Sequence, residues 1–465
     1  MGERKMEKKY GLFTAISMVV GIVIGSGVFF KSEAVLRACG GDMKIGIIAW
    51  AAVGFIMLVC ARTFAIFARK HKNAVGIVGY AESAIGRGYG FYVGWFMIMI
   101  YYPTLASTLA WLSARYTGAV FGFDSGSAEC MSLAFFFLCL SYAINALFPR
   151  LAGRLQVTTT AAKLLPLILM AVFGVAFGIA SGRLADNFGT YLPAEVISER
   201  ISGYMPSSAP LSAAVVSAAF AYEGWIIALS INSELHNAEK NLPRALIAGS
   251  VLVAAVYILY YIGIAGGADK LSLMADGERG VAEAYKTVFG SFGTALMLFI
   301  VISCLGTLNG LMFACTRGMY ELSSHGRGFD IFSEVSDKND MPQSSAVFGL
   351  FISAAWLLYY FNARISPTGA LRRFGFDSSE LPIISLYAMY IPIFFKLIRE
   401  KKYIMLPALA IGGCLFMIYA AAISHRRELV YYLILFAVVM LLGTAARKSE
   451  QKFVKNDEKM FGKNS

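Results

Sequence analysis

Met18-Val-Val-Gly-Ile-Val-Ile-Gly-Ser-Gly-Val-Phe-Phe30 is apolar enough to cross a bilayer, but its middle reads Gly25-Ser26-Gly27. Glycine costs about 1 kcal/mol relative to alanine inside a helix, so two glycines around a serine predict an opening in the helix. An opened helix exposes backbone N–H and C=O groups that lipid cannot satisfy. The opening must therefore face protein, water or a ligand.

A second apolar segment, 209–234, is interrupted in the same manner at Phe220-Ala-Tyr-Glu-Gly224. Two interrupted apolar segments at corresponding places in two halves of a chain are typical of the substrate site of a membrane transporter. The two interruptions therefore indicate a transporter, and they mark where its substrate is expected to bind.

The composition is that of a membrane protein. Of the 465 residues, 58% are apolar and 15% are charged, against about 45–50% and about 25% in soluble proteins. Runs of about 20 apolar residues predict an all-α polytopic membrane protein with twelve transmembrane helices. The predicted spans are 11–37, 45–66, 89–118, 128–147, 155–181, 209–234, 245–267, 291–317, 344–361, 379–395, 403–422 and 429–446.

The basic residues predict the orientation of the chain. With the N-terminus inside, the inner loops carry 24 Lys and Arg residues and the outer loops carry 11. Because positive residues concentrate on the cytoplasmic side, both termini are expected in the cytoplasm and the chain in the plasma membrane. The formal net charge of +12 comes mostly from this bias. The basic residues are spread over seven short inner segments, so nucleic-acid binding is not expected.

The two openings suit the two ends of a zwitterion. The half-helix after Gly25-Ser26-Gly27 begins with unpaired N–H groups and roughly +0.5 of a charge, which favours a carboxylate. At the second opening, free carbonyls near Phe220, Ala221 and Tyr222 favour an ammonium group. An α-amino acid carries both groups, so the predicted substrate is an amino acid. The alternative for the small residues is a closely packed helix interface.

Three side chains beside the openings or at mid-membrane are functional candidates. Glu223 places a carboxylate at mid-membrane, where ionisable groups are costly and usually functional. It can hold the substrate amine or a cationic side chain, or carry a proton; the alternative is a buried glutamate that is paired with Lys163 or neutral. Lys163 itself either faces a cavity or extends to the inner surface. Phe220 either gates the substrate or packs in the core.

Several other function classes find little support. The seven cysteines show no CxxC or Cys/His spacing, so no disulfide framework, metal site or cofactor is expected. The four histidines lie in loops or at helix ends, which argues against a membrane-embedded enzyme. A membrane sensor that binds amino acids without transport is the remaining alternative, although the chain shows no soluble signalling domain.

These motifs resemble those of the amino acid–polyamine–organocation superfamily, nearest its L-type amino acid transporter branch. The resemblance rests on Gly21-Ile-Val-Ile-Gly-Ser-Gly-Val-Phe29, on Phe220-Ala-Tyr-Glu-Gly-Trp225 and on residues 237–245. It covers the first eight predicted helices well and the remainder loosely. It implies a LeuT-like five-plus-five inverted repeat with discontinuous helices 1 and 6 and two additional helices.

The resemblance also divides the chain and suggests its assembly. Helices 11 and 12 are expected to be scaffold or a homodimer surface. A heavy-chain partner is not expected, because Cys130, the nearest candidate for an intersubunit disulfide, falls at the start of helix 4. The expected segments are a cytoplasmic N-terminus (1–10), a first repeat of helices 1–5 (11–181), a second repeat of helices 6–10 (209–395), helices 11 and 12 (403–446) and a cytoplasmic tail (447–465).

By the same resemblance, the chain is a secondary transporter that works by alternating access. The substrate carboxylate is expected on the amides of Ser26 and Gly27. The substrate amine is expected on the carbonyls of Ile24, Phe220 and Tyr222.

The resemblance further implies the coupling and the substrate range. Lys163 falls where sodium-independent relatives place a lysine, which implies an exchanger or a proton-coupled carrier. An acidic residue at Glu223 resembles the relatives that accept basic amino acids, so neutral and also cationic substrates are expected. The predicted substrate-binding residues are Ile24, Gly25, Ser26, Gly27, Phe220, Ala221, Tyr222 and Glu223, and the predicted coupling or gating residues are Lys163 and Phe220.

Overall fold

The computed structural model describes residues 11–70, 76–124, 126–201, 204–228, 235–324, 329–336, 341–366, 369–401 and 403–461. Within these ranges the chain consists of helices and loops, with one isolated β-bridge between Ser336 and Met341. This is the all-α architecture that the sequence predicts.

The helices follow one another with short connections. In chain order they are α1 (Leu12–Val23), α2 (Gly27–Ala38), α3 (Met43–Lys70), α4 (Gly76–Ile85), α5 (Arg87–Phe96), η1 (Met97–Tyr101), α6 (Tyr102–Phe121), α7 (Ala128–Leu147), α8 (Pro149–Leu169), η2 (Met170–Gly174), α9 (Val175–Ala180), α10 (Arg183–Gly189), α11 (Ala194–Arg200), α12 (Pro210–Ala219), η3 (Phe220–Tyr222), α13 (Trp225–Ala228), α14 (Ala238–Gly267), α15 (Lys270–Asp276), α16 (Glu278–Phe289), α17 (Ser291–Ser324), η5 (Asp330–Phe332), α18 (Gln343–Tyr360), η6 (Phe361–Ile365), η7 (Arg372–Phe374), α19 (Leu381–Arg399), α20 (Met405–Ser424) and α21 (Arg426–Phe461).

In the described ranges, ten helices are long and apolar enough to cross a membrane, against twelve spans predicted. The other two predicted spans, 11–37 and 209–234, are divided into shorter helices at the interruptions seen in the sequence; residues 229–234 of the second span lie outside the described residues. The prediction of discontinuous helices 1 and 6 is therefore confirmed. The ten long helices are Met43–Lys70, Arg87–Phe121, Ala128–Leu147, Ala162–Ala180, Glu239–Gly267, Ser291–Ser324, Gln343–Ala363, Leu381–Arg399, Met405–Ser424 and Arg426–Arg447.

The first break lies between α1 and α2. α1 ends at Val23, Ile24 is extended with φ −68° and ψ 94°, and α2 begins at Gly27. A side chain at Gly27 has no room, because a Cβ there would lie 2.7 Å from the Cα of Ala221 in the second break. The backbones of the two breaks are therefore in direct contact.

The second break follows α12. After Ala219 the helix tightens into the 3-10 turn η3, and Glu223 is then extended with ψ 159°. Gly224 has φ +104°, a conformation that glycine adopts without a steric penalty. The chain resumes as α13 at Trp225. Two residues thus leave the helical path at the position where the sequence predicts it.

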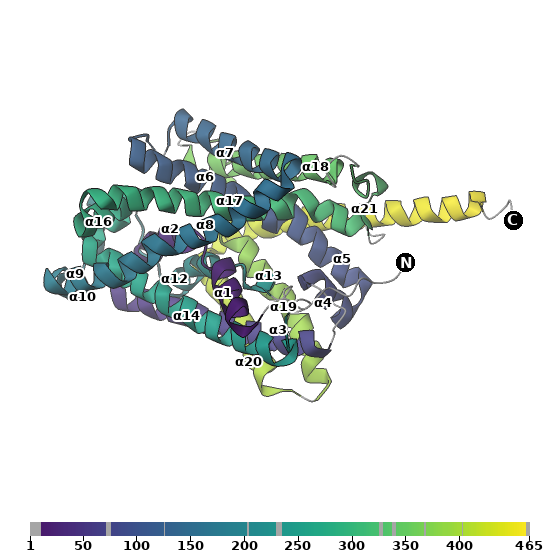
Figure 1. The fold of residues 1–465 in the computed structure, drawn as a ribbon, viewed down its shortest axis with the longest axis horizontal. Coiled ribbons are helices and arrows are strands. Elements are labelled where there is room, and N and C mark those ends of the chain that lie inside the picture. Colours follow the sequence, from purple (N-terminus) through teal and green to yellow (C-terminus); the bar gives the residue numbers. More distant parts are fainter. Residues whose placement is uncertain are drawn as a thin grey trace.

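The long helices lie side by side along the horizontal axis of Figure 1. α4 lies near one end of this bundle and α9, α10 and α16 lie at the opposite end; we call these the α4 end and the α16 end. Inside the bundle, α1 packs on α14, α2 packs on α12, and α17 packs on α6, α7 and α8. The broken helices are therefore enclosed by longer helices.

Candidate functional site

A cavity of about 410 Å³ lies where the two breaks meet. Ile24 and Tyr222 do not line it; the side chain of Ile24 is buried, and the Tyr222 hydroxyl donates to the Trp50 carbonyl at 2.8 Å. For these two residues the prediction concerned only the backbone carbonyl. The predicted residues that do line the cavity are Gly25, Ser26, Gly27, Lys163, Phe220, Ala221 and Glu223.

The start of α2 presents hydrogen-bond donors to the cavity. The Ser26 hydroxyl is buried with no oxygen or nitrogen partner, and it does not cap α2. The first N–H groups of an α-helix have no partner within the helix. Together with the partial positive charge of a helix N-terminus, these donors suit an anion such as a carboxylate.

A tyrosine of α14 joins the two breaks. The hydroxyl oxygen of Tyr257 lies 3.0 Å from the carbonyl oxygen of Val23 and 2.9 Å from that of Ala221, so it donates between them. Helix ends leave such carbonyls without a helical donor. Tyr257 is not among the predicted site residues; the available signal is that Tyr257, Tyr260 and Tyr261 place three hydroxyls in one apolar helix.

Glu223 carries an unused acceptor. Its Oε2 accepts a hydrogen bond from the Tyr101 hydroxyl at 2.6 Å, whereas its Oε1 is buried with no partner. Lys163 donates to the Gly21 carbonyl, and neither oxygen of Glu223 accepts from it, so the paired alternative is wrong. A buried carboxylate without a full set of partners is costly. The arrangement therefore suits a cationic ligand group or a proton.

Lys163 lies in α8 and binds the first break. Its ammonium is buried and donates to the carbonyl of Gly21 in the last turn of α1. That carbonyl belongs to a helix end, where the final C=O groups have no intrahelical donor. Lys163 thus lines the cavity and fastens α1 to α8; it does not extend to the surface.

Two asparagines complete the lining away from the breaks. The Asn145 amide nitrogen donates to Oδ1 of Asn309 at 2.9 Å, and Asn309 donates to the Ala152 carbonyl at 3.1 Å. Asn145 Oδ1 is buried without a partner. The polar stretch around Asn309 stands out in the sequence of its helix, but Asn145 is a single polar residue and gives no such signal.

Phe220 closes the cavity on the side of α2. Phe220 is 7% exposed, and its ring meets the Phe30 ring edge-on, with the centroids 5.1 Å apart. The Lys31 ammonium lies 5.7 Å from the same ring. Phe220 therefore contacts both the cavity and the core, and its role as a gate stays a prediction.

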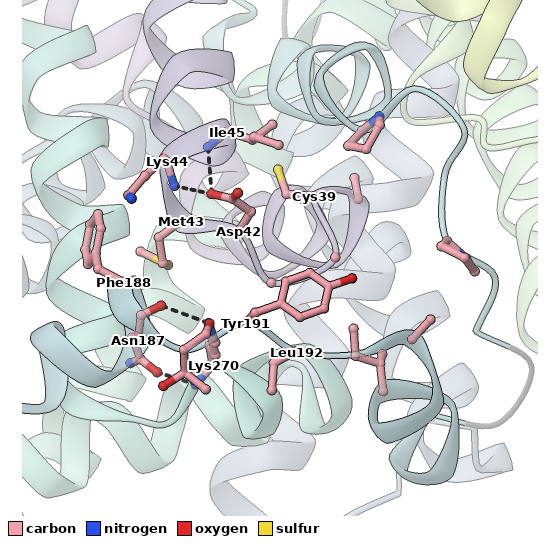
Figure 2. A pocket seen from close by; sticks show the side chains of 18 of the residues that line it. Cys39, Asp42, Met43, Lys44, Ile45, Asn187, Phe188, Tyr191, Leu192 and Lys270 are labelled. Atoms are coloured by element: carbon pink, nitrogen blue, oxygen red, sulfur yellow. Dashed lines mark hydrogen bonds between the residues drawn. The ribbon is translucent and has the colours of Figure 1, made fainter.

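A second cavity, of about 360 Å³, opens at the α16 end between the 38–45 segment and the 187–192 segment. Figure 2 shows that its polar groups are engaged by the protein itself: Asp42 accepts from two N–H groups at the start of α3, and Asn187 binds Lys270. The Lys270 ammonium donates to the carbonyls of Asn187 and Thr190. None of the residues lining this second cavity has a buried polar side-chain atom without a partner. The cavity at the breaks is therefore the better candidate site.

Comparisons with known proteins support this assignment. The amino acid permease family matches residues 10–445, which is nearly the whole chain. The chain is 28% identical over 436 residues to the serine/threonine exchanger SteT of Bacillus subtilis, covering 90% of this chain and 92% of that protein. It is 25% identical to the b(0,+)-type amino acid transporter 1 of Mus musculus, covering 76% of this chain and 70% of the relative.

One further relative and one solved structure are also similar to this chain. The large neutral amino acids transporter small subunit 2 of Oryctolagus cuniculus is 26% identical over 74% of this chain and 63% of the relative. The crystal structure of MhsT in complex with L-phenylalanine covers 92% of this chain and 99% of that chain with a TM-score of 0.56 and 15% identity, which supports the predicted fold. The relatives are transporters, in agreement with the expectation that the chain is not an enzyme. This chain belongs to the amino acid permease family, and it is an integral membrane protein of amino acid transport or exchange.

Proposed function

We propose that the protein is a sodium-independent secondary transporter that carries amino acids across the plasma membrane by alternating access, as an exchanger or with a proton. One observation carries this proposal: two helix breaks face a single cavity. The first break offers donors at Ser26, and the second offers an unused acceptor at Glu223. Such a cavity is complementary to a zwitterion.

In this proposal the substrate spans the two breaks. Its carboxylate binds the N–H groups of Ser26 and Gly27 at the start of α2. Its ammonium group binds the carbonyls of Ile24, Phe220 and Tyr222. The Phe220 carbonyl already accepts from the N–H of Glu223 at 3.2 Å, but a carbonyl oxygen has two lone pairs and can accept again.

Glu223 extends the substrate range in the same proposal. Its free Oε1 can accept from the ammonium or guanidinium of a cationic side chain, and Tyr101 holds its other oxygen in place. Hydrogen bonds to charged groups contribute about 1.5–3 kcal/mol, which is enough to favour one substrate class by tenfold or more. We therefore propose neutral and cationic amino acids as substrates.

Lys163 supports independence from sodium. Its ammonium already donates a hydrogen bond to the Gly21 carbonyl beside the first break. A sodium ion would need that kind of oxygen ligand, and a fixed positive charge at contact distance repels a second cation. Transport is therefore proposed to be driven by exchange of amino acids or coupled to protons.

The basic loops support the proposed orientation, with the α4 end in the cytoplasm. Among the cavity-lining residues, Asn145 lies in the last turns of α7 and Ala152 in the first turn of α8. α6 runs away from the α4 end and α7 returns, so this junction lies toward the α4 end. The cavity thus extends toward the proposed cytoplasmic side.

Assembly stays a prediction. A homodimer through α20 and α21 is compatible with their exposed apolar side chains, such as Leu415 and Leu441, and so is contact with lipid alone. Cys130 is fully buried at the start of α7 and offers no exposed thiol to a heavy chain.

Transport assays in proteoliposomes test the proposal against the sensor alternative. Purified protein is reconstituted with internal unlabelled amino acid, and uptake of labelled serine, leucine and arginine is followed with sodium or choline outside. The proposal predicts uptake that is equal in the two salts and faster with internal substrate or an inward proton gradient. Binding without flux would favour a sensor, and uptake that requires sodium would contradict the role of Lys163.

A further inference from the structure

A buried charge cluster lies on the α16 side of the cavity, apart from the predicted site. The Lys31 ammonium lies 2.6 Å from Oε1 of Glu380 and 3.0 Å from the Ser379 hydroxyl. The Ser217 hydroxyl donates to the same Oε1 at 2.8 Å. Nε2 of His425 lies 3.2 Å from the other oxygen of Glu380. We call these five residues the latch.

The latch connects four separate parts of the chain. Lys31 lies one turn into α2 and Ser217 lies near the end of α12, so both half-helices beside the breaks take part. Glu380 immediately precedes α19, and His425 lies between α20 and α21. The latch therefore joins the half-helices beside the breaks to the start of α19, and through His425 to the α20–α21 junction, which lies outside the two predicted repeats.

Its charges are shielded from water. The side chains of Lys31 and Glu380 are 2% and 5% exposed, and that of His425 is 17% exposed. Each carboxylate oxygen of Glu380 thus has a partner.

The latch lies directly behind the cavity wall. Lys31 is above the rings of Phe30 and Phe220, at 5.1 and 5.7 Å from their centroids, and Phe220 lines the cavity. The Lys31–Glu380 pair thus lies behind the Phe220 ring, on the side of the cavity that faces α2.

We propose that the latch locks the cavity shut toward the α16 end and must open for substrate to exchange there, with His425 setting its strength from the α20–α21 junction. The assignment of the α16 end to the outside rests on the proposed function, whereas the locking role of the latch does not. A buried ion pair that is only partly separated leaves unpaired charges in the protein interior, which is costly. The pair therefore favours a closed and a fully open arrangement over intermediate ones.

Accessibility of a cavity cysteine tests the latch without measuring transport. Thr307 lines the cavity beside Gly25, so a Thr307→Cys reporter is labelled with a membrane-impermeant maleimide added to one side of the membrane and then to the other. The labelled peptide is quantified by mass spectrometry, which separates it from native cysteines. The variant Lys31→Met with Glu380→Gln removes both charges together and avoids an unpaired one.

The expected result is one-sided. Removing the pair should speed labelling from the α16 side about tenfold and slow it from the α4 side, because the population shifts toward the outward-open state. His425→Leu should give a smaller change in the same direction, and His425→Gln, which keeps a donor for Glu380, should stay near the parent rate. The double variant Arg200→Gln with Asp276→Asn, an exposed pair near the same end, is the control and should change nothing.

The outcomes separate the two proposals. Unchanged labelling in the charge-free variant, or equal acceleration from both sides, would overturn the latch. If the parent protein binds but does not transport, the proposed function fails while one-sided labelling still supports the latch. If the parent transports and labelling is unchanged, only the latch fails.

Discussion

Two buried glutamates of this protein, Glu223 and Glu380, have the same chemistry and different surroundings. Glu380 has Lys31 and Ser217 on one oxygen and His425 beside the other. Glu223 has Tyr101 on one oxygen and nothing on the other. A buried charge is tolerated when it is paired and hydrogen-bonded. The first glutamate is therefore satisfied by the fold, and the second leaves capacity for a ligand.

The same contrast separates the two cavities. At the α16 end, Asp42 and Lys270 are occupied by backbone groups of the protein. At the breaks, Ser26, Asn145 and Glu223 each keep a buried polar atom without a nitrogen or oxygen partner. Unused hydrogen-bonding capacity, more than size, distinguishes the candidate site, since the volumes of about 410 and 360 Å³ are similar.

The largest expected effect comes from forcing the two breaks apart. Gly27→Val would push against the Cα of Ala221, only 2.7 Å from an added Cβ. Overpacking of this kind costs about 1–3 kcal/mol, and here it also displaces both halves of the site, so transport should fall about 100-fold or more. Initial uptake rates in proteoliposomes measure this. Gly412→Ala is the control, because nothing lies within 4 Å of its Cβ position; equal activity of the two variants would show that the breaks need not touch.

Lys163→Ala should have the next largest effect. It removes the donor of the Gly21 carbonyl and loosens α1 from α8. An unsatisfied buried polar group costs about 1–3 kcal/mol, so transport should drop roughly tenfold to 100-fold while the protein remains inserted in the membrane. Flux is compared at matched amounts of protein in the membrane. Unchanged flux would remove Lys163 from the mechanism.

Substituting the two glutamates sharpens their comparison. Glu223→Gln should lower uptake of arginine and lysine about tenfold relative to neutral amino acids, because it removes the charge that faces the ligand. Glu380→Gln should leave that ratio unchanged, even if it alters the overall rate. The ratio of kcat/KM values for arginine and leucine reports the difference. If both variants shift the ratio equally, Glu223 has no charge-selecting role.

The smallest expected effect is on pH. Burial would lower the pKa of His425, but its hydrogen bond to Glu380 and the charges of Glu380, Glu428 and Asp377 raise it above its usual value. Because the raised pKa belongs to the closed latch, protonation stabilises closure at low pH, and this contribution is lost as pH rises through the raised pKa.

Acidifying the α16 side from pH 8 to pH 6 should therefore raise the apparent KM on that side about two- to threefold. His425→Gln should remove this dependence, whereas the exposed-pair control should keep it. A profile identical in the parent and in His425→Gln would exclude His425 as the titrating group.

The sequence was informative where the signal is local. The glycines around Ser26 and the consecutive residues Glu223 and Gly224 predict broken helices. A charged Lys163 within an apolar run indicates a cavity or a partner. Tyr257 and Asn145 were not predicted, because their roles come from contacts with residues more than 30 positions away. The latch is harder still to predict, since Lys31 and Glu380 are 349 positions apart and nothing in the sequence indicates that they form a pair.

The two breaks are proposed to hold both ends of one zwitterion, and analogues of a single substrate can test this arrangement. Inhibition of labelled exchange is measured with a neutral amino acid, with its amide, which lacks the carboxylate, and with its hydroxy acid, which lacks the ammonium. Each analogue is expected to bind at least about tenfold more weakly than the amino acid, since each leaves one break unsatisfied. Inhibition by either analogue as strong as that by the parent amino acid would contradict it.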